Sequence, residues 1–448
     1  MRIIYFQLAF ILSAVNLLGQ SSTLEKLIEK SNLYYAANRA ASFRTIAAEA
    51  QINVIKNQFK PQPQAVYQLN YATYNNITGM VFPSFITPIS GPPTITNSYT
   101  GVFGSAAALL AKWEVATFGY QKSLLEQATI QTNLSRAKER SQQFKQNIQL
   151  SSIYLDWLAA TKLINVYQNN LARVNTASQL SQVLTQKGLR PGTDSALWSS
   201  EISKAKVLLE QQQMSVSTLF IQLQQVIGID TIFTAADTAM LNKLPSSIEE
   251  INSSSHPELQ LLQEEIKNQK SEINVLQQSK KPSLSVYGTG YVRGSGIDDN
   301  DSKTFQGLYF QRYNYGLGAQ LSVPLFEGAR TKVKVQQQQQ LTEAASADYQ
   351  LMQWQLQKQI AEADTSWQRA LNILLLTEAQ GQSAGFLFNA VTARYKAGLV
   401  SYTDVVLAQQ HLIQAEADIE KSKWEVWKSV LYKASVLGDL KFFTQLFK

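Results

Sequence analysis

The stretch Tyr313-Asn-Tyr-Gly-Leu-Gly-Ala-Gln-Leu-Ser-Val323 alternates apolar and polar side chains from end to end. Successive side chains of a β-strand point to opposite faces, so the alternation predicts a strand with one apolar and one polar face. Tyrosines at one end of the apolar face are typical of barrel strands that face lipid and line a wet interior with their other side. A hairpin of a soluble β-sandwich would show the same alternation.

Three further segments predict strands. Ala65, Tyr67, Leu69 and Tyr71 share one face of an extended segment, a weaker strand covers about 99–113, and another extends from Leu284 to Arg293. Residues rich in Gly and Pro, or in Gly and Asp, connect the members of each pair, as expected for loops. The sequence therefore predicts two β-hairpins, at about 62–113 and about 283–325.

A very long helix is predicted after each hairpin, over about 119–187 and about 328–396. Neither segment contains proline, and apolar residues recur at helical spacing in both. Each is followed by a tight turn and a returning segment with apolar residues in steps of seven, which indicates left-handed supercoiling. We therefore expect two coiled-coil hairpins with their tips at 188–194 and 398–404.

The second half of the chain repeats the first at a fixed shift. Moving along by 210 residues places Trp157 on Trp367, Gly188 on Gly398 and Asp194 on Asp404. A duplicated unit of this length predicts two similar halves within one protomer. We expect a first repeat at 21–228, a linker at 229–257 and a second repeat at 258–448.

The first residues predict a secretory signal peptide at 1–20. Arg2 precedes an apolar stretch that ends near Leu18, and small or polar residues follow. A retained transmembrane anchor is the alternative, but the stretch is short for one. The chain has no cysteine, which excludes disulfides, thiolate metal sites and a lipidated N-terminal cysteine.

Composition argues against several classes of function. The net charge is +7, but Lys and Arg are scattered singly, so binding to nucleic acid has little support. With two histidines and no phosphate-binding loop, nothing in the sequence points to an enzyme, a metal site or a cofactor. Four strands cannot close a barrel, and open edges in hydrocarbon would leave backbone groups unpaired. The chain must therefore associate in the membrane; two copies would supply eight strands and three would supply twelve.

Three motifs resemble the TolC-like outer membrane efflux protein family. These are Ser322-Val-Pro-Leu-Phe-Glu-Gly-Ala-Arg330 before a long helix, its counterpart Trp113-Glu-Val-Ala-Thr-Phe-Gly119, and Arg394-Tyr-Lys-Ala-Gly-Leu-Val-Ser-Tyr-Thr-Asp404. The resemblance covers nearly all of the chain after residue 20. It implies a mainly helical homotrimer with one twelve-stranded β-barrel in the outer membrane and a helical tunnel through the periplasm.

The same resemblance implies a function and partners. The chain would be the passive exit duct of a tripartite efflux or type I secretion system, with outer membrane lipid around its barrel. A periplasmic adaptor would join it to an inner-membrane pump of RND or ABC type. The tips would dock on the adaptor; the residues concerned are Gly188, Leu189, Thr193, Gly398, Leu399 and Thr403.

The resemblance also implies a constriction at the last helical turns, held closed by links among Tyr, Arg and Asp side chains. The candidate residues are Asp404, Tyr395, Arg394, Asp194 and Arg190. The chain departs from the family pattern at Val400 and Leu407, where an Arg and a second Asp are expected. We therefore expect a single acidic ring of Asp404 and a weakly linked gate. The tip glycines and Asp194 and Asp404 also suit helix ends for purely structural reasons.

Two other classes of protein remain alternatives. A coiled-coil scaffold or adhesin of the envelope would have long helices but no need of the alternating strands. A periplasmic adaptor would carry one helical hairpin between small β-domains, whereas this chain has two hairpins in tandem.

Overall fold

The computed structural model describes residues 20–73, 96–97, 99–188, 192–230, 232–235, 240–243, 256–298 and 301–446. The predicted signal peptide, apart from Gln20, lies outside these residues. The chain forms two compact units. We call them the helical unit (Met1–Ile46, Asn133–Ile266 and Ala344–Lys448) and the sheet unit (Ala47–Thr132 and Lys267–Glu343).

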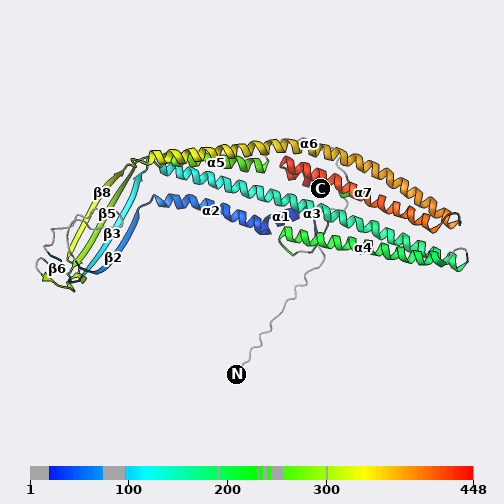
Figure 1. Cartoon of the computed structure of the whole chain (residues 1–448), viewed down its shortest axis with the longest axis horizontal. Coiled ribbons are helices and arrows are strands. Elements are labelled where there is room, and N and C mark those ends of the chain that lie inside the picture. The colour runs from blue at the N-terminus through cyan, green and yellow to red at the C-terminus, as the bar shows by residue number, and fades with distance from the viewer. Residues whose placement is uncertain are drawn as a thin grey trace, which may run out of the picture. The chain divides into compact units, whose positions relative to one another are not determined.

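The sheet unit is built on one antiparallel sheet of four strands in the order β2-β3-β5-β8 (Figure 1). Their bounds are β2 Gln62–Ala72, β3 Val102–Ala116, β5 Ser283–Ser295 and β8 Arg312–Ser322. Each predicted hairpin supplies two adjacent strands, and the pairing of β3 with β5 joins the hairpins. A short ribbon of β6 (Ile297–Asp298) and β7 (Asp301–Ser302) and the turn η3 (Gln306–Leu308) follow β5.

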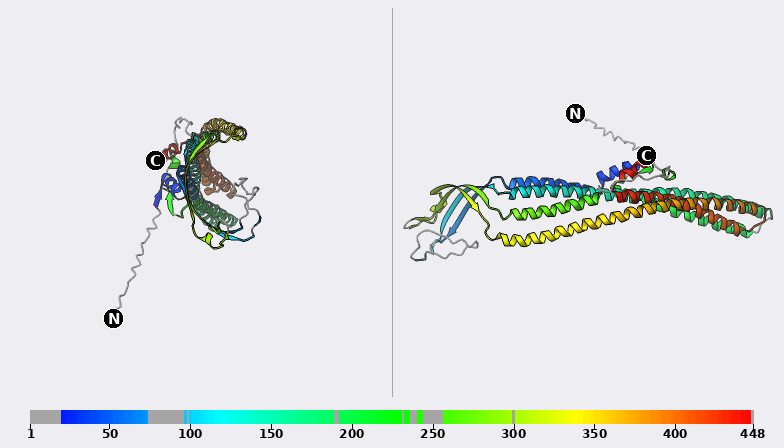
Figure 2. Two further views of the ribbon diagram at one scale, coloured as in Figure 1. Left: turned by 90° about the vertical axis from the view of Figure 1, so that its left-hand side faces the viewer. Right: turned by 90° about the horizontal axis from the view of Figure 1, so that it is seen from above.

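Four long helices make two antiparallel pairs (Figures 1 and 2). The first pair is α3 (Tyr120–Gln186) with α4 (Gly192–Ile227), and the second is α6 (Glu327–Lys396) with α7 (Tyr402–Leu437). Helices α3 and α6 begin and end within one residue of the bounds expected from the sequence. The boundary between the units falls inside these two helices, so each is shared by both units.

Two shorter helices lie beside the first parts of two long helices. Helix α2 (Ala36–Gln58) lies beside α3, and α5 (Pro257–Gln278) lies beside α6 (Figure 1). In the sheet unit, Ile55 and Phe59 bury their side chains with Ala128 of α3. The indole of Trp113 donates a hydrogen bond to the Phe59 carbonyl at 3.0 Å, which ties the end of β3 to the end of α2.

The main core lies in the helical unit, where five helices (α3, α4, α7 and two shorter ones) and two short elements meet. Its largest members are aromatic or branched: Leu150, Tyr154, Trp157, Leu223, Phe233, Trp427 and Phe443. Helix α1 (Leu24–Tyr34) and helix α8 (Leu440–Leu446) contribute to this core, and β1 (Gln20–Ser22) pairs in parallel with β4 (Phe233–Ala235) beside it. The turn η1 (Met240–Asn242) adds Leu241. The described parts of the predicted linker, β4 and η1, thus pack on the helices.

Ion pairs join α7 to α3 and to α6 in the helical unit. Arg173 of α3 makes two bonds to the Glu416 carboxylate, at 3.0 and 2.6 Å. Lys433, which is 7% exposed, lies 2.7 Å from Asp364 of α6. Removing one partner of a buried ion pair is destabilising, because the other charge is left unpaired. Among the described helices, none has an apolar run long enough to cross a membrane.

Candidate functional site

The sheet has one apolar and one polar face, and the strand register produces them. Tyr67, Ala107, Val292 and Tyr313 stand opposite one another across the four strands. Because paired residues of antiparallel strands share a face, this row and the rows two residues away form one surface. That surface is apolar almost throughout; it comprises Ala65, Tyr67, Leu69, Tyr71, Ala107, Leu109, Ala111, Trp113, Val286, Val292, Tyr313, Tyr315, Leu317, Ala319 and Leu321.

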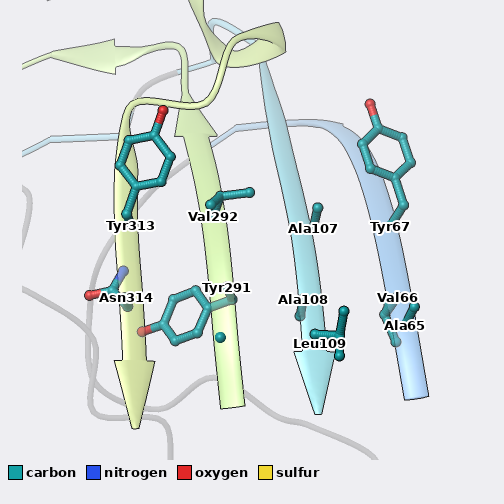
Figure 3. Close-up of a pocket in the computed structure, with 11 residues that line it drawn as sticks. Ala65, Val66, Tyr67, Ala107, Ala108, Leu109, Tyr291, Val292, Tyr313 and Asn314 are labelled. Carbon is teal, nitrogen blue, oxygen red and sulfur yellow. The ribbon is translucent and has the colours of Figure 1, made fainter. Parts of the chain in front are cut away.

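The opposite face carries polar side chains at both edges of the sheet. Gln64, Gln68 and Asn70 lie there on β2, and Asn314 and Gln320 lie there on β8. Figure 3 shows the two kinds of row next to each other, with Tyr67 and Tyr313 on the outer strands and Asn314 in the neighbouring row. The labelled residues line a broad pocket of about 620 Å³ on the sheet.

Most of the apolar face is left exposed by the parts of the chain that the structure describes. Tyr315 is 93% exposed and Leu317 is 89% exposed. Within the described residues, β2 and β8 each have a strand neighbour on one side only. A large exposed apolar face marks an interaction with lipid or protein, and unpaired strand edges invite pairing with another chain.

The second helical tip is closed by two standard helix ends. At the end of α6, the backbone N–H of Leu399 donates to the Arg394 carbonyl and that of Gly398 to the Tyr395 carbonyl, with Gly398 at φ 79°. At the start of α7, Ser401 and Asp404 form a reciprocal capping box. The Asp404 carboxylate accepts hydrogen bonds from the Ser401 amide and hydroxyl at 2.8 and 2.6 Å.

Asp404 is fully exposed although it serves the helix cap. The hydrogen bonds from the Ser401 side chain and amide hold the pKa of its carboxyl below the usual value, and the positive charge of Arg394 acts in the same direction. The structure therefore keeps a negative charge at this tip near neutral pH. The charge of Arg394 thus acts on Asp404, and the role of the two residues in a gate stays a prediction.

Tyr395 and Asp194 join the second hairpin to the first. The Tyr395 hydroxyl donates to the Asp194 carboxylate at 3.2 Å, and both side chains are buried, at 2% and 8% exposed. Around this link, residues of all four long helices pack in what we call the tip cluster: Val174, Trp198, Ala205, Tyr395 and Val405. Tyr395 thus bonds to the aspartate of the other tip.

Tyr402 closes the tip cluster toward the turn. Its ring meets that of Trp198 edge to face, with the centroids 4.9 Å apart and the planes at 88°. Burial raises the pKa of Tyr402 to about 12, and the negative charges of Glu201 and Asp194 add to the shift. The phenol therefore stays neutral near neutral pH.

The remaining predicted tip residues lie at the surface or outside the described residues. Gly188, Thr193, Gly398, Leu399 and Thr403 are exposed, with Leu399 at 69%. Gly188 has φ 70°, and a β-carbon there would meet nothing within 4 Å. Leu189 and Arg190 fall among the residues that the structure does not describe.

Three site residues were missed by sequence reasoning. Ser401, three residues before Asp404, is the N-cap; the capping pattern Ser-x-x-Asp was legible, but only Asp404 was expected at the helix start. Trp198 and Tyr402 gave no signal, because a lone aromatic in a coiled coil reads the same whether it faces its partner helix or solvent. In the part of the chain that the structure describes, no group of three metal-ligating side chains comes together.

Comparison with known proteins supports the resemblance seen in the sequence. Residues 252–426 match the model of the family described as outer membrane efflux protein. The outer membrane protein TolC of Vibrio cholerae serotype O1 (strain ATCC 39315 / El Tor Inaba N16961) is 26% identical over 160 residues, which are 36% of this chain and 35% of the relative. The match thus spans about a third of that relative's length.

Solved structures share the fold over nearly the whole chain. The outer membrane protein VceC from Vibrio cholerae superposes with a TM-score of 0.70 at 15% identity, covering 93% of this chain and 96% of the other. The CmeC outer membrane channel of Campylobacter jejuni gives 0.69 at 15% identity, covering 93% and 85%. The prediction of a mainly helical protein with a few strands is confirmed.

These comparisons point to channel proteins and not to enzymes. The predicted family resemblance and location are confirmed. Residues 252–426 thus match the outer membrane efflux protein domain, and the chain has the fold of the outer membrane channels over nearly its whole length.

Proposed function

We propose that this chain is the exit duct of a tripartite efflux or type I secretion system. Its substrates would pass passively from a periplasmic adaptor and an inner-membrane pump of RND or ABC type to the outside. The observation that carries the proposal is the sheet with an exposed apolar face, a polar face and two free edges. Such a sheet suits lipid on one side and a water-filled channel on the other.

The free edges support a homotrimer whose three sheets close one twelve-stranded barrel. Closing the sheet removes the unpaired backbone groups that hydrocarbon cannot satisfy. In the closed barrel, β8 of one copy would pair with β2 of the next. The two repeats of the sequence would each supply a hairpin to the barrel and a helical hairpin to the periplasmic tunnel, and residues 1–20 would be removed during export.

Engineered disulfides test this pairing cleanly because the chain has no cysteine. Gln64→Cys on the polar face of β2 is combined in turn with Cys at Asn314, Gly316, Gly318, Gln320 and Ser322, which share that face on β8. Two strands separate β2 from β8, so the positions within one copy lie about 14 Å or more apart, too far for a disulfide. Any bond must therefore join two copies.

We expect one of the five pairs to yield covalent trimers in denaturing gels. The matched control places the second cysteine at the odd-numbered positions Tyr315, Leu317, Ala319 and Leu321, which lie on the apolar face. These controls should not cross-link with Gln64→Cys. Covalent dimers that never extend to trimers would contradict a closed ring of three.

We also propose that the helical tips dock on the adaptor and form the gate. Exposed Leu399 and the exposed glycines offer apolar and close-approach contacts to a helical hairpin, and Leu189 would do the same at the first tip. Asp404 would form the acidic ring, with Arg394 and Arg190 as the nearby cations. The bond from Tyr395 to Asp194 would help hold the tip closed.

Single-channel recording in planar bilayers tests the gate. Asp404→Asn removes the charge but keeps an oxygen that can accept from Ser401, whereas Asp404→Ala removes both. We expect both variants to lose cation preference and block by multivalent cations, since the charge is the shared change. Unchanged selectivity in both variants would exclude Asp404 from the conduction path.

Tyr395→Phe tests the link between the hairpins. The substitution leaves the buried Asp194 carboxylate without the phenol donor, a loss of about 1–3 kcal/mol. We expect larger or more frequent open steps because the closed tip is weakened. Folded, inserted protein that shows no steps in wild type or in this variant would favour the alternative, an envelope scaffold or adhesin that conducts nothing.

A further inference from the structure

Below the helical tips, the helical unit contains a cavity of about 310 Å³ that the proposed duct does not use. All four long helices contribute to its wall. The apolar part of the wall comprises Ala172, Ala177, Leu180, Trp198, Phe388, Tyr395 and Val405. Its mouth is at the surface, since Thr176 and Lys396, which also line it, are exposed.

Three residues of this wall have buried polar atoms without a hydrogen-bond partner among the described residues. The atoms are Arg173 Nε, Trp198 Nε1 and Thr392 Oγ1. The first two can only donate, and the hydroxyl of Thr392 can donate after rotation about its side-chain bond. Buried donors are normally satisfied, and a concentration of unsatisfied ones at one cavity indicates a missing acceptor.

The charges around the cavity favour the same kind of ligand. Arg173 and Lys396 line it, and the lining residues that the structure describes include no aspartate or glutamate. The two terminal nitrogens of Arg173 are hydrogen-bonded to Glu416, which orients the guanidinium group. The N–H at Nε has no hydrogen-bond acceptor among the described residues. An apolar wall with a few convergent donors is the usual composition of a small-molecule site.

We propose that this cavity binds a small aromatic carboxylate. Its ring would lie against Trp198, Phe388 and Val405. Its carboxylate would accept hydrogen bonds from the side chains of Thr392, Arg173 and Lys396. Because the wall includes Tyr395, whose hydroxyl holds Asp194, the bound molecule braces the two helical hairpins against each other. The site needs neither transport nor a partner protein, so its test is independent of the proposed function.

The probe is 2-naphthoate, titrated calorimetrically into the purified full-length protein in detergent, with empty micelles as the reference. The matched probe is 2-naphthylmethylamine, which has the same ring and the opposite charge. Thr176→Trp blocks the mouth from an exposed position whose hydroxyl bonds only to the Ala172 carbonyl of its own helix. Its control is Thr129→Trp, on the same helix, exposed and bonded in the same way to Leu125.

We expect saturable binding of 2-naphthoate, at least tenfold weaker binding of the amine, and loss of naphthoate binding in Thr176→Trp but not in Thr129→Trp. Thr392→Val keeps the shape of the wall and removes one donor, so it should weaken naphthoate binding several-fold while leaving the far-ultraviolet circular dichroism unchanged. Equal binding of the two probes, or full naphthoate binding in Thr176→Trp, would overturn the proposal.

Discussion

His256 should make the packing of α5 against α3 and α7 in the helical unit less stable at low pH. It precedes α5, and its ring is only 6% exposed and packs edge to face on Phe144 of α3. The backbone N–H of Glu258 donates to its Nδ1 at 3.1 Å, and its Nε2 lies 3.2 Å from the Ser435 carbonyl of α7. Nδ1 accepts, so the proton of the neutral ring is on Nε2. A second proton on Nδ1 would remove the acceptor of this hydrogen bond and place two N–H groups, those of Nδ1 and Glu258, against each other.

The direction and limit of the effect follow from the buried position. Burial lowers the pKa of His256 from its ordinary value of 6.5, and the nearby charge of Lys145 does so too, against opposing effects of the Ser435 carbonyl and Glu258. Because the unfolded ring binds its proton more tightly, the stabilisation is complete above pH 6.5 and is lost as pH falls through the folded pKa. One titrating group can change the free energy of opening by at most about 1.4 kcal/mol per pH unit, which is a tenfold change in the equilibrium constant for opening.

Hydrogen exchange of peptides from the start of α5, followed between pH 8 and pH 5 and corrected for intrinsic rates, measures that opening. The control is His256→Asn, because asparagine can accept from the Glu258 N–H as a helix cap and does not titrate. We expect protection to fall toward pH 5 in wild type and to stay level in the variant. Glu258, whose pKa is lowered by Lys145 and Ser141, loses its own contribution only at lower pH. The same fall in both proteins would refute the role of His256.

Three further outcomes are expected. Trp157→Ala, in the main core, should cost about 3–5 kcal/mol, seen as a lower thermal midpoint, whereas Trp354→Ala, at a position 57% exposed, should change stability by less than about 0.5 kcal/mol. Gly398→Ala should cost about 1–2 kcal/mol from its φ of 79° alone, while Gly328→Ala, also without neighbours but at an ordinary φ inside α6, should be neutral or stabilising; equal effects would contradict this explanation. The phenol of Tyr402 should titrate near pH 12 in the ultraviolet difference between wild type and Tyr402→Phe, and a transition near pH 10 would be inconsistent with its burial.

The strands and long helices were predictable because their signals are local. In β8, side chains alternate between lipid-compatible and polar types residue by residue, and the register puts them on two faces as the alternation requires. Helices α3 and α6 carry no proline over their whole length, so little in the sequence competes with the helix. At the start of α7, Asp404 was expected at a helix end, whereas the N-cap Ser401 was missed.

The rest depended on contacts between distant segments. The parallel pairing of Gln20–Ser22 with Phe233–Ala235 involves strands of three residues, too short for any periodicity to show. Asp194 was expected at a helix start, where it does lie, but its bond to Tyr395 arises only when the two hairpins pack. The cavity beneath the tips likewise belongs to no single element, since four helices make its wall.

The pairing of β3 with β5 has a consequence for the order in which the chain acquires its structure. Ala108 of β3 pairs with Tyr291 of β5, which belongs to the other half of the sequence, so the centre of the sheet must wait until most of the chain has been synthesised. Helices α3 and α4 precede β5 in the chain and pair as one hairpin, so they can form before the centre of the sheet, because contacts between distant residues are slow to establish. During that interval the tyrosine-rich strands are exposed in water. Newly exported chains should therefore need chaperone protection for the strands and little for the helices.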